Sequence, residues 1–443
     1  MRGGLHGSAI LVMITRHVCP VLSLFRQIGP SFPFPMCATA LFPIDVTALR
    51  HALAERLERW DGGCPRIAEE ASSRALDLSG RPLFLLGAGS KLALPFVRAA
   101  VAEYDVCGLV DNHPPAALRA LAGGGLTGPA LLDDSGFRAR LAETPGALAV
   151  LCASSEAGLA HFAALAASAG VPTLTLIQAL RRTANPDWAG HFADAGMLRR
   201  IYGALEDGSL CFADDLSRAT AYALLLHRLT GALHWLDSVR LPERAAYFFT
   251  DILQPHDDEV FVDGGAFTGD SLKAFARRTK GRWRHIHAFE PDPACHPPLR
   301  ATLASLARAE GHYAGLWSHS GIMPVATGVH HRVVFPGSVL PGSVLPGAEP
   351  PDDLPSMPVV AVDDRDLGPV SLIKMDIEGA ESAALEGARQ TLARFRPRLA
   401  VCVYHRPGDL VEIPQLLTQL RPDSQFYLRH HGPTLFETVL YVV

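Results

Sequence analysis

Three segments in the second half of the chain each join an apolar run to acidic or glycine residues at its carboxyl end. Residues 260–270 read VFVDGGAFTGD, residues 286–291 read IHAFEP, and residues 373–381 read IKMDIEGAE. A short apolar run bounded by turn residues is typical of a buried strand. In open α/β sheets, ligands bind at the edge where the strands' carboxyl ends meet. The sequence therefore predicts an α/β sheet with a ligand site built from three strand ends.

The first of these segments supplies a glycine-rich turn. Asp263 ends the expected strand, and Gly264, Gly265 and Gly269 follow it. Glycine lets the backbone turn sharply and approach a ligand at a point where a Cβ atom would collide. A helix that begins near Gly269 would direct its free amide groups at the same ligand. We therefore expect Asp263 and the three glycines to bind a cofactor.

The other two segments each supply an acid. Glu290 falls 27 residues after Asp263, which is close to the spacing at which an acid binds ribose hydroxyls in dinucleotide-binding folds. Asp376 ends the third strand and is expected in the same site. The alternative is that the glycines serve packing and that the acids are solvated strand ends.

These motifs give the C-terminal region, about residues 245–443, a resemblance to a known family. The matching pieces are residues 261–270, 289–291, 373–381, 404–405, 428–431 and 437–441. They resemble the FkbM family of S-adenosylmethionine-dependent methyltransferases. The resemblance implies that S-adenosyl-L-methionine is the cofactor, that Asp263, Gly265 and Gly269 lie near its methionine part, and that Glu290 holds its ribose. The family usually has Asn where this chain has Phe267, which puts any polar contact of that Asn in question here.

Methyl transfer from a sulfonium is an in-line displacement that depends mainly on alignment of donor and nucleophile. A hydroxyl nucleophile also benefits from a base. We expect Asp376 as the first candidate, and His405, which follows an expected strand at 399–404, as the second. His430 and His431 end an expected strand at 425–428 and come third, and we expect all three histidines in loops near the cofactor. A purely structural role for each histidine stays open.

Two further acids follow Asp376. Glu378 and Glu381 are expected to be charges at a helix N-terminus, where they would stabilise the helix dipole. A metal ion held by Asp376, Glu378 and a histidine is conceivable, but the spacing does not require one. We therefore expect no metal.

A second glycine turn lies in the first half of the chain. Residues 82–86 read as a strand that leads into Gly87 and Gly89, followed by a helix at 92–103 and a strand at 106–110 that ends at Asp111, 24 residues after Gly87. Further strands are expected at 147–152 and 171–176, with a helix at 156–169. The dinucleotide fingerprint fails at its third glycine, where Leu92 stands. The turn could bind a phosphate or sugar nucleotide, or the domain could be structural.

A length of 443 residues predicts two or more domains. We expect two Rossmann-like α/β domains, the second a doubly wound methyltransferase sheet that closes with an antiparallel hairpin of residues 425–428 and 438–442. The expected order is a disordered or mis-assigned tail (1–44), a helical lead-in (45–80), a Rossmann-like domain (81–180), a helical connector (181–250) and the methyltransferase domain (251–443). The connector includes an apolar helix at 222–236, and the lead-in a helix at 46–60.

Composition narrows the range of partners and compartments. A net charge of −5 creates no global attraction to nucleic acid or to anionic membranes. The eight cysteines contain no Cys-x-x-Cys pair, which favours a reduced, cytoplasmic protein. The apolar stretch at 8–25 is interrupted by Arg16 and His17, so it is not expected to span a membrane.

The N-terminal tail and one repeat stay open. The tail could be a targeting peptide, a disordered segment, or an artefact if translation begins at Met36. The sequence GSVLP occurs twice in tandem at 337–346. The repeat is either a loop that covers the acceptor pocket or an insertion without function.

The function expected from this sequence is S-adenosylmethionine-dependent O-methylation of a small molecule or a sugar, including a glycan. Two alternatives stay open. One is a NAD-dependent or sugar-nucleotide-dependent enzyme centred on Gly87 and Gly89, and the other is a binding module that keeps the fold without catalysis.

Overall fold

The computed structural model describes residues 44–60, 76–90, 93–122, 128–183, 195–248, 252–324, 326–327, 333–334 and 356–443. Residues 1–43 and the tandem repeat at 337–346 lie outside the described residues, so the alternatives for the tail and the repeat remain predictions.

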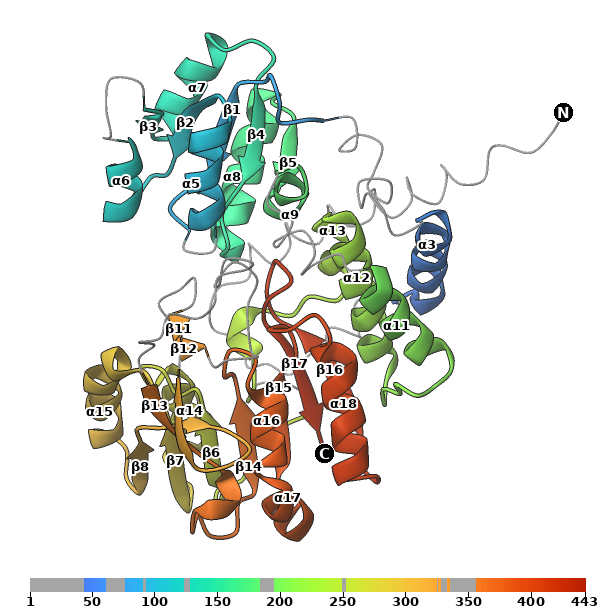
Figure 1. Ribbon diagram of the computed structural model, residues 1–443, viewed down its shortest axis with the longest axis vertical. Coiled ribbons are helices and arrows are strands. Elements are labelled where there is room, and N and C mark those ends of the chain that lie inside the picture. Colours follow the sequence, from blue (N-terminus) through green and yellow to red (C-terminus); the bar gives the residue numbers. More distant parts are fainter. Residues whose placement is uncertain are drawn as a thin grey trace, which may run out of the picture. The chain divides into compact units, whose positions relative to one another are not determined.

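The first half of the chain forms a five-stranded parallel sheet (Figure 1). Its order is β3-β2-β1-β4-β5, and its strands are β1 (Leu83–Leu86), β2 (Val106–Val110), β3 (Ala130–Leu132), β4 (Leu148–Leu151) and β5 (Thr173–Thr175). Every residue of β1 is buried, as expected for a central parallel strand with both faces covered. This arrangement confirms the predicted parallel α/β sheet in the first half.

Helices cover both faces of this sheet. They are α5 (Leu94–Glu103), α6 (Ala116–Ala122), α7 (Asp134–Ala142), α8 (Glu156–Ala169) and α9 (Leu176–Leu180). Leu83 and Leu85 pack in one cluster with residues of α5 and α9, whereas Phe84 and Leu86 pack in another with residues of α7 and α8. The expected strand at 171–176 is shorter than predicted, because Thr175 caps α9 with its hydroxyl.

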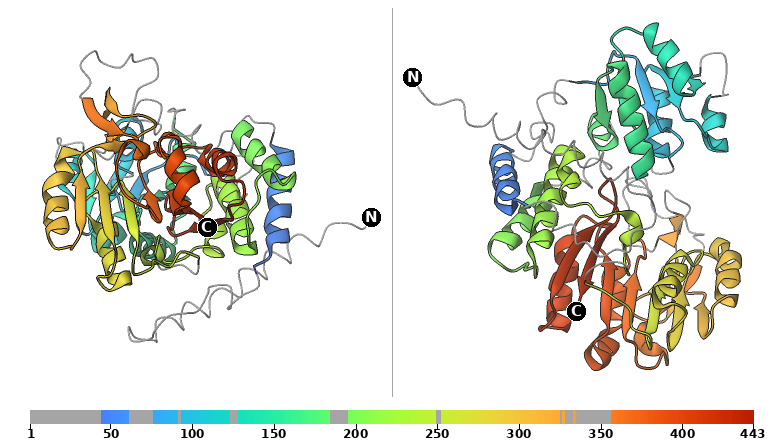
Figure 2. Two further views of the ribbon diagram at one scale, coloured as in Figure 1. Left: turned by 90° about the horizontal axis from the view of Figure 1, so that it is seen from below. Right: turned by 180° about the vertical axis from the view of Figure 1, so that it is seen from behind.

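A helical segment lies between the two sheets in the sequence. It contains α11 (Ala195–Glu206), α12 (Asp215–Thr230), α13 (His234–Asp237) and the 3-10 helix η3 (Glu243–Ala245). The predicted helix at 222–236 is two helices, because Gly231 adopts a φ of 73° and ends α12. The predicted helix near the start of the chain is α3 (Val46–Arg59), and Figure 2 shows it beside α11 and α12.

The second half forms a seven-stranded sheet in the order β16-β17-β15-β14-β6-β7-β8. Its strands are β6 (Val260–Gly264), β7 (His285–Phe289), β8 (Ala309–His312), β14 (Leu372–Met375), β15 (Arg398–Cys402), β16 (Phe426–His430) and β17 (Thr438–Val442). β17 is antiparallel to both β15 and β16, which confirms the predicted terminal hairpin. From β6 the chain builds β7 and β8 on one side and then β14 and β15 on the other, so the order reverses between β6 and β14. Such a reversal is where ligands bind in open α/β sheets.

Helices cover both faces of this sheet as well. One face carries α14 (Asp270–Thr279) and α15 (His296–Ala304), and the other carries α12, α16 (Glu381–Glu386), α17 (Arg389–Phe395) and α18 (Asp409–Leu420). The 3-10 helices are η4 (Pro293–Cys295) and η5 (Val362–Asp364). Smaller sheets are formed by β9 (Gly315–Leu316), β10 (Gly321–Pro324) and β13 (Ser356–Val360), and by β11 (Ala326–Thr327) and β12 (Val333–Val334). Among the described helices, none has the length and apolarity that a bilayer crossing requires.

Candidate functional site

A cavity of about 270 Å³ lies where the chain leaves β6, β7 and β14. Three of the predicted site residues line it, one from each strand end: Gly265, Glu290 and Asp376. The other predicted residues, Asp263, Gly264, Gly269 and His405, are not among the residues that line this cavity. The structure therefore brings the three strand ends together as predicted, and the roles of the remaining residues depend on what they contact.

The glycine turn packs against the end of β14. Gly265 has a φ of 74°, and a Cβ atom there would collide with the backbone carbonyl of Asp376. The Asp376 amide donates to the Gly264 carbonyl at 3.1 Å, and the Gly265 amide donates to the Phe289 carbonyl at 3.0 Å. Contact between two strand ends therefore explains the glycine at 265, whereas the sequence-based explanation was close approach of a ligand.

Beneath the turn, Asp263 forms a buried ion pair. The Lys374 ammonium lies 3.1 Å from Asp263 and donates to the carbonyls of Gly264 and Gly265, at 3.1 and 2.9 Å. The Ser271 hydroxyl donates to the second Asp263 oxygen. Burial disfavours the ammonium form of Lys374, but Asp263 and other nearby carboxylates raise its pKa above the ordinary value. Asp263 therefore supports the glycine turn indirectly, by positioning Lys374, which holds the turn in place. The sequence suggested no role for Lys374.

Glu290 is fixed by backbone amides. One carboxylate oxygen accepts from the Phe267 amide at 2.8 Å and the other from the Asp292 amide at 2.9 Å. Burial raises the pKa of Glu290. Phe267 adopts a φ of 49°, which is rare for a non-glycine residue. The turn thus directs its own amide toward the Glu290 carboxylate.

Two tyrosine hydroxyls bind the Asp376 carboxylate. Tyr404 donates to one oxygen at 3.1 Å and Tyr247 to the other at 3.2 Å. Burial and the nearby Asp376 carboxylate raise the pKa of both phenols well above the ordinary value. Both hydroxyls therefore stay protonated and donate to Asp376 at neutral pH. Both tyrosines also line the cavity.

His405 lies among three carboxylates. Its Nδ1 is 2.9 Å from Glu381, and its Nε2 is 3.4 Å from Asp376 and 3.7 Å from Glu378. The side chain is only 2% exposed. Burial alone would lower its pKa, but Glu381 and Asp376 raise the pKa of His405 well above the ordinary value. The imidazolium therefore links these acids at neutral pH.

The expectation of a helix N-terminal charge is wrong for Glu378 and is confirmed for Glu381, which has further contacts. Glu378 lies ahead of α16, in a turn where its φ is 56°. Glu381 is the first residue of α16, but its carboxylate accepts from the Ile377 amide at 2.9 Å and contacts His405. Both acids therefore belong to the cluster around His405.

His430 and His431 do not join the three carboxylates and do not line the cavity, and His430 lies in a strand where a loop was predicted. His430 is the last residue of β16, and its Nδ1 is 2.9 Å from the Thr438 hydroxyl. His431 Nε2 is 3.0 Å from the Tyr441 hydroxyl. Burial lowers the pKa of His430 to about 3 and that of His431 to about 4. Both are neutral buried side chains that hold the terminal hairpin.

The cavity is strongly acidic. Besides Glu290 and Asp376, five carboxylates line it: Glu243, Asp270, Asp292, Glu378 and Glu437. Sequence analysis considered Glu378 only as a helix charge or a metal ligand, and it assigned no role to the other four. Among the residues that line the cavity, the basic side chain is that of Lys374, which is already paired with Asp263. Such a lining favours a cationic or neutral ligand over an anionic one.

In the N-terminal sheet, the glycine turn is occupied by a side chain of the same domain. The Gly89 amide donates to the Asp111 carboxylate at 2.9 Å. A Cβ atom at Gly89 would collide with Asp111 and Pro115. Gly89 therefore has a structural explanation that requires no ligand, and nucleotide binding by this domain remains a prediction.

Comparison with known proteins bears on the family that the C-terminal region resembles. Residues 263–423 match the family model described as the Methyltransferase FkbM domain. Among solved structures, the chain is similar to the methyltransferase FkbM from Methylobacillus flagellatus KT, with 24% identity and a TM-score of 0.67, over 90% of this chain and 100% of that chain. An rRNA methylase from Streptococcus thermophilus aligns with 14% identity and a TM-score of 0.25, over 42% of this chain and 86% of that chain. The comparison with curated proteins found no match.

Proposed function

Because residues 263–423 form a methyltransferase domain of the FkbM family, we propose that the chain is an S-adenosylmethionine-dependent O-methyltransferase that acts on a small molecule or a sugar. The observation that carries this proposal is the acidic cavity in which Gly265, Glu290 and Asp376 meet at three strand ends.

The residues of the cavity suit this cofactor. When bound, S-adenosylmethionine supplies a methyl group on a positively charged sulfur, and an acceptor oxygen can take this methyl group and displace the sulfur. The carboxylates of the lining favour such a cation, and Glu290 is placed at the strand end where an acid can accept from both ribose hydroxyls. The amides of Phe267 and Asp292 hold the Glu290 carboxylate in one orientation, so it needs little rearrangement to accept these hydrogen bonds.

We assign the acceptor side of the cavity to Asp376. Its carboxylate is oriented by Tyr247 and Tyr404, and it can accept the hydrogen bond and then the proton of an acceptor hydroxyl. His405 acts through Asp376, because its raised pKa keeps it protonated and unable to accept a proton at neutral pH. The two tyrosines and His405 also make Asp376 a weaker base, so orientation of the hydroxyl supplies a large part of the effect.

The acceptor is proposed to be a neutral, hydroxyl-bearing molecule. An acceptor with a carboxylate or phosphate near the reacting hydroxyl would meet the acids at Glu243, Glu378 and Glu437, which line the same cavity. Like-charge contacts of this kind disfavour a partner. A sugar or another polyol avoids that cost and offers several donors to the carboxylates.

Calorimetry with S-adenosylhomocysteine tests the cofactor. We expect binding by the full chain and a loss of about 1.5–3 kcal/mol in Glu290→Ala, the range for hydrogen bonds to charged groups. Asp258→Ala, an exposed acid of the same domain, serves as the control. NAD serves as the control ligand and should not bind. Unchanged affinity in Glu290→Ala would remove this residue from the site, and binding of NAD alone would favour the oxidoreductase alternative.

Incubation with labelled S-adenosylmethionine and a cell extract, followed by mass spectrometry, tests catalysis. A labelled neutral product that carries an O-methyl group supports the proposal. Cofactor binding without any labelled product would favour a non-catalytic binding module, and a labelled amine or an anionic product would overturn the assignment of the acceptor class.

A further inference from the structure

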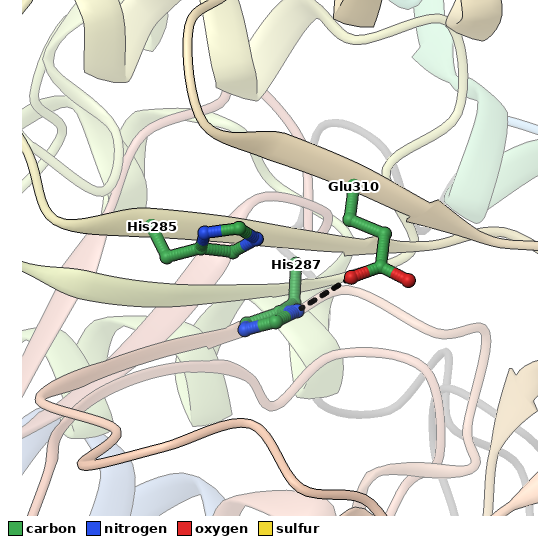
Figure 3. A group of neighbouring side chains, drawn as sticks. All are labelled: His285, His287 and Glu310. Carbon is green, nitrogen blue, oxygen red and sulfur yellow. Dashed lines mark ion pairs between the residues drawn. The ribbon is translucent and has the colours of Figure 1, made fainter.

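Four side chains with metal-binding atoms gather at the edge of the C-terminal sheet, and none of them lines the cavity. His285 and His287 are two residues apart on β7 and therefore point to the same face of the sheet. Glu310 on β8 pairs with His287 in parallel register, so it projects from the same face. Figure 3 shows the three side chains beside one another. Their ligand atoms all lie within 4.8 Å of one another.

The fourth side chain is His312, two residues after Glu310 on β8. Its Nε2 lies 3.2 Å from His287 Nδ1, and the same Nδ1 lies 3.9 Å from a Glu310 oxygen. In a tetrahedral site with metal–nitrogen bonds of about 2.0–2.1 Å, two ligand nitrogens lie about 3.3–3.4 Å apart. The separation between His287 and His312 is already close to this value.

The chemical state of these side chains suits a metal ligand. Burial lowers the pKa of His287 to about 4 and also lowers that of His312, so both rings are neutral at pH 7 and each offers a lone pair. His285 Nε2 is buried and has no hydrogen-bond partner within the described part of the chain. A buried polar atom without a partner costs free energy, which a bound ion would remove.

We propose that His285, His287 and Glu310, with His312 as the fourth ligand, form a binding site for a divalent transition-metal ion of the zinc class. Zinc and similar divalent transition metals favour imidazole and carboxylate ligands, and zinc is usually bound by four ligands. Magnesium and calcium favour sites made of oxygen atoms alone and fit this set poorly.

The ion has a structural role. β8 is the edge strand of the sheet, and ligands from both β7 and β8 tie it to its only strand neighbour in this sheet. The ring of His312 stacks on Phe289, with 4.3 Å between centroids, and Phe289 lines the cavity together with the next residue, Glu290. His285, His287 and Glu310 do not line the cavity, so the ion supports its wall without taking part in methyl transfer.

Metal binding by the full chain, purified without a histidine tag and stripped with a chelator, tests the site. Titration with zinc chloride in a calorimeter should show one ion per chain and a higher melting temperature. Cobalt chloride should give the absorption bands of a tetrahedral ion with imidazole ligands. Glu310→Gln is the main variant, because the Glu310 side chain is 59% exposed and the change preserves its shape. His287→Ala is the second, and His319→Ala, an exposed histidine of the same domain, is the control.

Loss of a residue that only hydrogen-bonds a metal ligand weakens metal binding by about 10–100-fold. Glu310→Gln and His287→Ala change the ligands themselves, so each should weaken zinc binding by at least this factor. His319→Ala should bind as the unaltered chain does. If Glu310→Gln and His319→Ala bind zinc equally well, or if the unaltered chain binds none, the proposal is overturned. If His287→Ala does not fold, Glu310→Gln still decides the outcome.

Discussion

At the scale of single residues, local pattern was enough to identify three positions of the cavity but not their partners. Gly265, Glu290 and Asp376 each follow an apolar run, and the end of a parallel strand has a known place in the sheet. Tyr247 could not be identified in this way, because it lies 129 residues from Asp376 and its position depends on how the chain returns to the sheet. Glu437 likewise reaches the cavity only through the turn between the last two strands.

Asp376 and His405 should respond differently to substitution. Asp376→Asn should lower the rate of methyl transfer by about 10²–10⁴, the usual share of acid–base catalysis. His405→Ala removes a positive charge beside Asp376, so the pKa of the Asp376 carboxylate should rise. Because Asp376 is active when ionised, the acid limb of the rate profile should then move to higher pH. Rate measurements across pH check both effects, and an unshifted limb in His405→Ala would mean that this histidine is only structural.

Phe267 offers a prediction about stability. Its φ of 49° is unfavourable for a residue with a Cβ atom, and its side chain is 40% exposed, so substitution removes less packing than it would at a fully buried ring. Phe267→Gly should relieve about 1 kcal/mol or more of left-handed strain, and Phe267→Asn should relieve part of it. Chemical denaturation measures the change. A loss of stability in both variants would show that the ring of Phe267 makes contacts that outweigh the strain.

At the scale of elements, the sequence predicted the central strands and the edge strands β5 and β16, but it missed the edge strands β3 and β8. β1, β6 and β14 are buried throughout because both faces of a central parallel strand are covered, and they are largely apolar apart from the paired Asp263 and Lys374. β3 and β8 lie at the edges of their sheets, and the AEGH sequence of β8 contains no apolar run. Edge strands bury less surface, so their sequences carry a weaker signal. Their positions follow from the parallel order of the sheet and from the helices that precede them.

The contact between β6 and β14 predicts how Gly265 responds to substitution. In Gly265→Ala the new Cβ atom would collide with the Asp376 carbonyl, in addition to the strain of a φ of 74°. Gly281→Ala is a matched control, because Gly281 has a φ of 79° and open space around the position of its missing Cβ atom. Gly281→Ala should cost about 1–2 kcal/mol, the usual penalty of the left-handed conformation. Gly265→Ala should cost clearly more in denaturation experiments, and equal losses would exclude the contact with Asp376 as the reason for this glycine.

At the scale of the whole molecule, the sequence predicts a helical connector at 181–250 that is separate from the methyltransferase domain. The structure shows which surface the helices of this connector pack against. Residues of α3, α11 and α12 lie in the same hydrophobic cluster as residues of β14, β15 and β17. The periodicity of α12 predicted a helix with an apolar face, but amphipathic pattern alone does not identify the surface that a helix packs against. The boundary at 250 remains a prediction, and these helices share a core with the sheet that follows it.

A buried charge gives this packing a specific attachment point. Arg429 on β16 is only 1% exposed, and it donates to both carboxylate oxygens of Asp214, the residue that caps the N-terminus of α12. Burial would raise the pKa of Asp214, but Arg429 and Ser217 lower it below its usual value. The folded-state pKa therefore lies below the unfolded one, so the ion pair stabilises the fold above the unfolded pKa. Its contribution is lost as the pH falls through the lowered folded-state value.

Removal of one partner tests this attachment. Asp214→Ala leaves the buried Arg429 guanidinium without its carboxylate and removes a helix cap, so we expect a loss of about 3 kcal/mol, the lower end for broken buried pairs because Asp214 is partly exposed. The neighbouring Asp215→Ala is the control, since its pair with Arg218 is exposed and should be worth less than about 1 kcal/mol. The difference between the two variants should appear in denaturant midpoints at neutral pH and shrink toward acid pH, where Asp214 is protonated in the unaltered chain. Equal losses in both variants would mean that α12 is held by apolar contacts alone, and that Arg429 finds other acceptors when Asp214 is removed.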